Sequence, residues 1–131
     1  MITVLQTSQV RDPGTKAVLT AYLGDMPDID IPQVYVEALK GYIQVWLIHN
    51  NVDLSAIFVT TVTEDAEGRT VQLVYLGGRC RRADFRAINN ALSKMKEHTG
   101  ADRIELRTKH NFGRAFRRFG WQQFGDTWWR V

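Results

Sequence analysis

The most constraining feature of this chain of 131 residues lies near its end, from Arg103 to Trp121. Ile104 and Leu106 occupy alternate positions, which is the period-two pattern of a half-buried strand. The spacing then changes to i, i+3, i+4 and i+7, which defines one helix face: Phe112, Ala115, Phe116 and Phe119. Asn111 is suited to cap the start of this helix, and Gly120 to end it. The segment therefore predicts a strand, a helix, a glycine stop and a closing pair of aromatic strands.

The preceding residues predict a mixed α/β domain. Strands are expected at 2–5, 42–48, 54–63, 69–76 and 103–107, and helices at 15–23 and 32–40. Short polar turns join the strands from 42 to 76, which favours an antiparallel meander.

A further helix is expected between Gly77–Gly78 and Gly100, because apolar residues recur on one helix face at Phe85, Ile88, Leu92 and Met95. A strand, helix and strand in succession favour a right-handed crossover, so strands 69–76 and 103–107 are predicted to be parallel. The two glycines are expected to interrupt the ladder, which would make these strands splay.

Length and composition place the chain among small soluble proteins, and a single domain over 1–131 is predicted. No apolar run approaches the ~18 residues of a transmembrane helix. The N-terminus lacks the pattern of a signal peptide, so a cytoplasmic location and no membrane partner are expected. Cys80 is the only cysteine and is interpreted as a passive thiol in a reducing compartment. The three histidines lack metal-ligand spacing, so no metal is predicted.

Charge is distributed unevenly along the chain. Residues 1–68 carry three basic and nine acidic side chains, a balance of −6, whereas residues 69–131 carry fourteen basic and five acidic ones, a balance of +9. This asymmetry favours an anionic partner for the second half, such as the phosphates of coenzyme A, a nucleic acid or an acidic protein. The alternative is that the two halves neutralise each other in the folded protein.

The predicted order, β-α-α-β-β-β-α-β-α-β-β, resembles the fold of the GNAT superfamily, the Gcn5-related N-acetyltransferases. The resemblance implies that the helix after the fourth strand binds the pyrophosphate of acetyl-CoA through its first N–H groups. The family pattern there is Gln/Arg-x-x-Gly-x-Gly/Ala, and the best match runs from Arg82 to Ala87. Phe85 stands in place of the central glycine, and Asp84 adds a negative charge near the phosphate position.

The resemblance also implies a tyrosine that protonates the departing thiolate, and Phe116 stands at its position. Phenylalanine has no proton to donate, so general acid catalysis is not expected there. The segment from Gly77 to Arg82 offers a substitute anion site, with flexible N–H groups and three arginines; the alternative is a tight turn with solvated arginines. The expected cofactor-binding residues are Leu76, Gly77, Gly78, Arg79, Arg81, Arg82, Phe85, Ala87, Asn111 and Phe116.

Two functions remain open from the sequence. The segment from Leu76 to Arg86 and the ending Arg118 to Trp121 also resemble GNAT-like proteins of bacteriophages, some of them internal virion proteins. That resemblance implies a binding or assembly role, in the cytoplasm or the virion, with weak or absent acetyltransferase activity. The alternative is an active acetyl-CoA-dependent N-acyltransferase on an unknown amine. Trp128 and Trp129 point to opposite faces of the last strand, which favours a homo-oligomer formed through the C-terminal strands.

Overall fold

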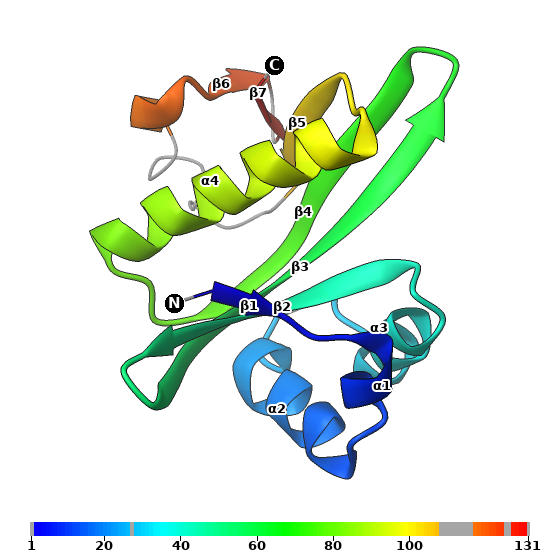
Figure 1. Cartoon of the computed structure of the whole chain (residues 1–131), viewed down its shortest axis with the longest axis vertical. Helices are drawn as coiled ribbons and strands as arrows, with labels where there is room; N and C mark the ends of the chain where they lie inside the picture. The colour runs from blue at the N-terminus through cyan, green and yellow to red at the C-terminus, as the bar shows by residue number, and fades with distance from the viewer. Residues whose placement is uncertain (1, 27, 108–116, 125–126, 131) are drawn as a thin grey trace. The chain divides into compact units, whose positions relative to one another are not determined.

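A computed structural model describes residues 2–26, 28–107, 117–124 and 127–130 of the chain. The helices of this part are α1 (Thr7–Val10), α2 (Pro13–Leu23), α3 (Ile31–Leu39), α4 (Arg82–Thr99) and the short 3₁₀ helix η1 (Arg117–Phe119). The strands are β1 (Ile2–Val4), β2 (Ile43–Asn50), β3 (Asp53–Asp65), β4 (Gly68–Gly78), β5 (Arg103–Arg107), β6 (Gln122–Phe124) and β7 (Thr127–Arg130). Hydrogen-bonded neighbours follow the order β1-β2-β3-β4-β5-β7-β6 (Figure 1). The predicted mixed α/β fold is confirmed.

Two features differ from the prediction. The four-residue helix α1 was not expected, because so short a helix leaves no periodic pattern in the sequence. Strand β4 was expected to stop at Leu76, but it continues through Gly77 and Gly78. Most of the predicted helix carrying Phe112, Ala115, Phe116 and Phe119 lies outside the described residues, and its last three residues, Arg117–Phe119, form the 3₁₀ helix η1.

The chain forms two compact units, and β3 and β4 contribute to both of them. The first unit contains Met1–Thr60 and Leu76–Arg79, and the second contains Thr61–Tyr75 and Cys80–Val131. No helix in the described part of the chain is long and apolar enough to cross a membrane.

In the first unit, aspartates begin both long helices. The Gly14 N–H donates to Asp12 Oδ1 over 2.8 Å at the start of α2, and the Gln33 N–H donates to Asp30 Oδ1 over 3.1 Å at the start of α3. A proline follows in the first turn of each helix, where its missing N–H is not needed. These caps fix where the helices start and so determine which residues face the core.

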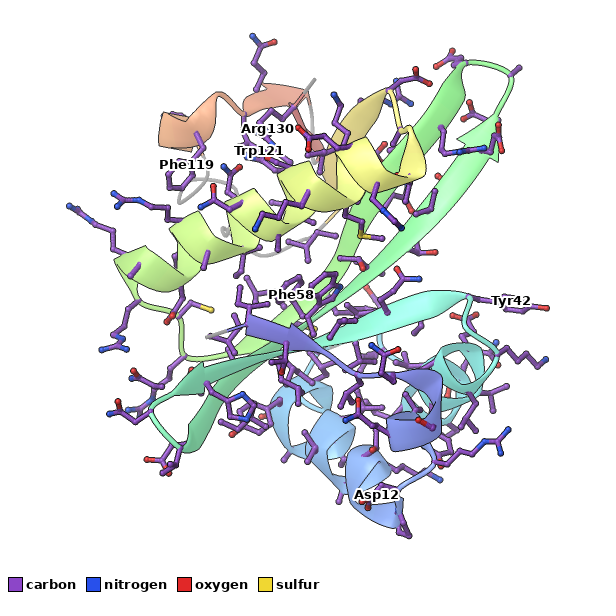
Figure 2. All side chains as sticks on the ribbon, in the orientation of Figure 1. Asp12, Tyr42, Phe58, Phe119, Trp121 and Arg130 are labelled. Carbon is purple, nitrogen blue, oxygen red and sulfur yellow. The ribbon has the colours of Figure 1, made fainter. Side chains whose placement is uncertain are left out.

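The core of the first unit combines helix and strand side chains. Leu19 and Leu23 of α2 are fully buried, as is Phe58 of β3. The Phe58 ring stacks on Trp46 of β2, with centroids 5.4 Å apart and planes 6° from parallel (Figure 2 labels Phe58). The Trp46 Nε1–H also donates to the Thr60 hydroxyl over 2.9 Å, so the half-buried indole keeps a hydrogen-bond partner.

In the second unit, β4 and β5 run parallel, as the sequence predicted. The register pairs Thr70 with Arg103 and Leu73 with Leu106. Strand β7 then pairs antiparallel with β5, and β6 pairs antiparallel with β7. Helix α4 packs on this group of strands and buries Ile88 and Leu92.

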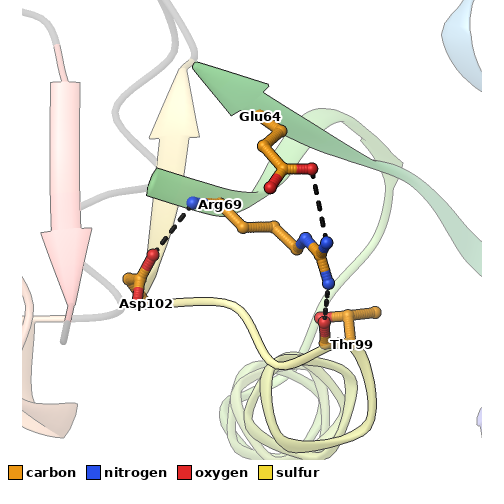
Figure 3. Close-up of polar contacts among 4 residues, drawn as sticks. All are labelled: Glu64, Arg69, Thr99 and Asp102. Carbon is orange, nitrogen blue, oxygen red and sulfur yellow. Dashed lines mark hydrogen bonds and ion pairs between the residues drawn. The ribbon is translucent and has the colours of Figure 1, made fainter. Parts of the chain in front are cut away.

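A polar network fixes the end of α4 against the β3–β4 hairpin (Figure 3). The Arg69 guanidinium donates to the Thr99 carbonyl and to Glu64 Oε2, the latter over 3.3 Å. The Arg69 backbone N–H donates to Asp102 Oδ2 over 2.9 Å. Gly100 ends the helix with φ +69°, as its position predicted. These contacts join the start of β4 to the end of α4 and to the residue before β5.

Candidate cofactor site at the start of helix α4

The first turn of α4 is capped by a carboxylate of the same helix. The backbone N–H of Arg81 donates to Asp84 Oδ2 over 2.7 Å. The Arg81 Nε lies 4.0 Å from the same oxygen, and the Asp84 side chain is 13% exposed. The positive end of a helix dipole favours a negative charge at this position. Asp84 therefore supplies the charge that an incoming phosphate would otherwise supply.

Some backbone N–H groups of this turn already donate hydrogen bonds within the helix, and others do not. The N–H groups of Asp84 and Phe85 donate to the Arg81 carbonyl oxygen over 2.9 and 3.2 Å. The N–H groups of Arg82 and Ala83 form no hydrogen bond with the described residues, as is usual for the first positions of a helix. A phosphate reaching this turn would find two donors and, beside them, the Asp84 carboxylate.

The residues expected to hold the cofactor within the helix are packed to different degrees. Phe85 and Ala87 are half-buried, whereas Arg81 and Arg82 are exposed. The side chain at the position of the family's central glycine thus lies partly against the protein. The geometry fits a pyrophosphate poorly, because the helix carries both its own carboxylate and a bulky ring where the family pattern has open backbone.

The preceding glycines belong to the first unit, where their environment is crowded. Gly77 is buried, and a Cβ atom there would overlap the carbonyl oxygen of Tyr22 in α2. Gly78 has φ +97°, and a Cβ atom there would lie 2.5 Å from the Ser55 carbonyl oxygen. Close backbone packing therefore accounts for both glycines without a ligand.

Of the residues on either side of the glycines, Leu76 is buried and Arg79 donates a backbone hydrogen bond. Leu76 is 2% exposed in the core. The Arg79 N–H donates to the Ser55 carbonyl oxygen over 2.8 Å, while the Arg79 side chain is exposed. The sequence suggested that these residues form a substitute anion site. In the structure, the arginine side chains of that site face solvent, and the Arg79 N–H already donates to an acceptor.

Cys80, at the start of the second unit, is expected to react slowly with alkylating reagents. Burial, and then the nearby Asp84 charge, raise the pKa of the thiol to about 11. The neutral thiol is unreactive, so the rate at pH 7.5 should be roughly 100-fold lower in the folded protein than in urea, and should rise about tenfold per pH unit. Iodoacetamide labelling followed by mass spectrometry measures both rates. Equal rates in the folded and unfolded protein would contradict this assignment.

Two predicted site residues, Asn111 and Phe116, lie outside the described residues. The absence of a general acid at position 116 therefore stays a sequence-based prediction. Within the described ranges, no group of three His, Cys, Asp or Glu side chains is arranged to hold a metal.

The charge of Asp84 was expected from the sequence, but its hydrogen bond to Arg81 was not. The signal that indicates this bond is an acidic residue three positions after the residue that caps the helix.

Solved structures resemble this chain in fold along almost its whole length. A probable acetyltransferase superposes with a TM-score of 0.71 at 11% identity, covering 95% of this chain and 91% of that one. A ribosomal-protein-alanine N-acetyltransferase from Brucella melitensis biovar Abortus 2308 gives 0.65 at 10% identity, with 95% and 96% covered. A predicted acetyltransferase with acetyl-CoA from Clostridium acetobutylicum gives 0.65 at 12% identity, with 96% and 92% covered.

No protein-family model matches the sequence, and the search of curated proteins found no relative. At identities of 10–12%, these superpositions establish the fold of the chain but not its activity. The expected GNAT-like fold is therefore confirmed by structural similarity.

Proposed function

We propose that this chain is a binding or assembly protein on the GNAT scaffold, with weak or absent acetyltransferase activity. One observation carries the proposal: the Asp84 carboxylate accepts the Arg81 N–H at the start of α4. In the GNAT pattern this turn holds the cofactor's pyrophosphate. A carboxylate in its place both satisfies the helix end and repels a phosphate.

Two sequence positions support the same conclusion. Phe85 replaces the glycine that would let a phosphate approach the backbone, and Phe116 replaces the tyrosine that would protonate the leaving thiolate. Losing one stabilising donor typically lowers a rate by about 10²–10³. Two such losses, together with the charge of Asp84, favour a scaffold that has kept its architecture and lost its transfer chemistry.

The assembly role we propose is that of a bacteriophage virion-associated protein that self-associates through its C-terminal strands. The support is the resemblance of the arginine-rich helix start and the Arg118–Trp121 ending to GNAT-like phage proteins. Strand β6 lies at the end of the order of the described strands, so its outer edge pairs with none of them and could pair with a second copy.

The second candidate function is acetyl-CoA-dependent transfer to an amine. It is favoured by the similarity in fold to a structure that contains acetyl-CoA, and by the N–H groups of Arg82 and Ala83, which donate to no acceptor among the described residues. Bound acetyl-CoA would supply the activated acyl group. The pyrophosphate would then be held by these two N–H groups and the neighbouring side chains of Arg81 and Arg82.

Calorimetry with acetyl-CoA tests the proposal through the charge of Asp84. The wild-type protein is expected to show no micromolar binding. Asp84→Asn keeps a side-chain oxygen that can accept the Arg81 N–H but removes the negative charge, so affinity should rise roughly tenfold, the effect of ~1.4 kcal/mol. Glu97→Gln is the matched control, because it makes the same charge change at the exposed far end of the same helix.

Micromolar binding by the wild-type protein would overturn the proposal and favour the enzyme. An equal gain from Asp84→Asn and Glu97→Gln would show that net charge alone matters, and that no phosphate approaches the first turn of α4. The expected result is a gain confined to Asp84→Asn.

A further inference from the structure

The outward face of α4 carries positive charge along most of its length. The exposed residues of the helix are Arg82, Ala83, Arg86, Asn90, Lys94, Glu97 and His98. Four of these exposed residues follow one another at intervals of four along the helix: Arg82, Arg86, Asn90 and Lys94. Residues four apart lie on one side of a helix, so these four form a continuous stripe, here called the α4 stripe.

The stripe lacks the negative charges that usually accompany such a face. No ion pair within the described residues involves Arg82, Arg86 or Lys94. Asp84 is directed into the helix cap instead, and Glu97 is the one acidic side chain on the exposed face, near its far end. Solvated helix faces ordinarily intersperse both signs, with acid–base pairs three or four residues apart. The uncompensated charge of the α4 stripe therefore points to an anionic partner.

We propose that the α4 stripe binds the phosphate backbone of a nucleic-acid duplex without reading its sequence. Lys94 lies twelve residues after Arg82 along the helix, so the stripe spans about 18 Å at ~1.5 Å of rise per residue. That length faces about five phosphates of one strand at ~3.4 Å of axial rise each. Arginine guanidinium groups form paired hydrogen bonds with phosphate oxygens, and the Asn90 amide adds a neutral donor.

The side chains around the stripe favour a nucleic acid over a membrane. Helices that bind lipid surfaces place bulky apolar side chains beside their charges, but Ile88 and Leu92 of α4 are buried in the core of the second unit. The α4 stripe itself contains no aromatic side chain, and the aromatic ring among the exposed residues of the helix is the His98 imidazole, four residues beyond Lys94. The stripe therefore offers no Phe, Tyr or Trp ring on which an unpaired base could stack. A regular duplex backbone is the partner that this surface fits best.

This inference does not depend on whether acetyl-CoA binds. The acetyl-CoA question concerns the backbone N–H groups of the first helical turn and Asp84, whereas Arg86 and Lys94 lie one to three turns further along the helix. Variants of these two residues therefore test the surface separately from the cofactor site.

Fluorescence anisotropy with a labelled 20-base-pair duplex, in 50, 100 and 200 mM KCl, tests the proposal. The wild-type protein should bind with a Kd in the micromolar range at 50 mM. Arg86→Gln/Lys94→Gln should weaken binding about tenfold and reduce the slope of log K against log salt by about 1.8, since each phosphate contact contributes about 0.9. Arg11→Gln/Lys16→Gln is the matched control, because it removes one Arg and one Lys from exposed positions in the first unit.

The control should change affinity less than threefold. Equal losses in the two double variants, or no binding by the wild-type protein at 100 µM, would overturn the proposal. Competition with poly-L-glutamate distinguishes an acidic protein: displacement of the duplex at equal charge concentration would assign the stripe to acidic protein surfaces instead. Circular dichroism of each variant confirms that a loss of binding does not reflect unfolding.

Discussion

Gly77→Ala is expected to lower the free energy of unfolding by about 3 kcal/mol or more, enough to leave much of the protein unfolded at room temperature. The added Cβ atom would overlap the Tyr22 carbonyl oxygen and lie 2.9 Å from Leu23 Cδ2. Both neighbours belong to the last turn of α2, and a backbone carbonyl cannot turn aside as a flexible side chain can. Urea denaturation followed by tryptophan fluorescence measures the change.

Gly14→Ala provides the matched control for this prediction. It makes the same substitution in the first turn of α2, where the nearest heavy atom, Asp12 Oδ1, lies 3.3 Å from the added Cβ and belongs to a side chain. Its effect on the free energy of unfolding should stay within about 1 kcal/mol, because alanine is the better helix former and the contact is mild. Two variants of equal stability would show that Gly77 is not required for packing.

The result also bears on the interpretation of the glycine pair. A large loss for Gly77→Ala supports the view that β4 is glycine-rich because α2 passes close to it. A small loss would restore the sequence-based hypothesis that Gly77 and Gly78 are there to expose N–H groups to an anion.

The periodic parts of the chain predicted the fold well, because their signals are local. Alternation at Ile104 and Leu106 gave β5 with its observed bounds, and Gly100 ends α4 in the predicted left-handed conformation. The parallel pairing of β4 with β5 followed from the strand–helix–strand order. The need for a glycine at position 77 could not be predicted in this way, because it comes from the close approach of Tyr22, a residue 55 positions away in the sequence.

The candidate site was less predictable than the fold. Asp84 was recognised as a negative charge near the phosphate position, but its hydrogen bond to Arg81 is a matter of side-chain direction. The sequence left the arginines divided between an anion site and a solvated surface, and it did not distinguish the first turn of α4 from the outward face further along. Phe116, the position that bears on acid catalysis, and Asn111, the expected helix cap, lie outside the described residues.

Trp121→Ala is expected to lower the free energy of unfolding by about 3–5 kcal/mol. Trp121 is 3% exposed, and its Nε1–H donates to Asn89 Oδ1 of α4 over 2.9 Å. The Arg130 guanidinium of β7 lies over the indole ring, 5.9 Å from its centroid, and also donates to the Ser93 hydroxyl of α4 (Figure 2 labels Trp121 and Arg130). Removing the indole therefore leaves a cavity and releases contacts between α4 and the C-terminal strands. Thermal and urea denaturation followed by circular dichroism measures the loss.

Trp121→Phe separates packing from hydrogen bonding at the same place. Phenylalanine keeps a large aromatic ring, so most of the packing should remain, but the buried Asn89 Oδ1 would lose its donor, which costs about 1–3 kcal/mol. Asn89→Ala and the double variant complete a double-mutant cycle, in which the double variant should lose less stability than the sum of the single ones by about 1 kcal/mol. Additive losses would show that the bond contributes nothing, and that Trp121 holds the C-terminal strands by packing alone.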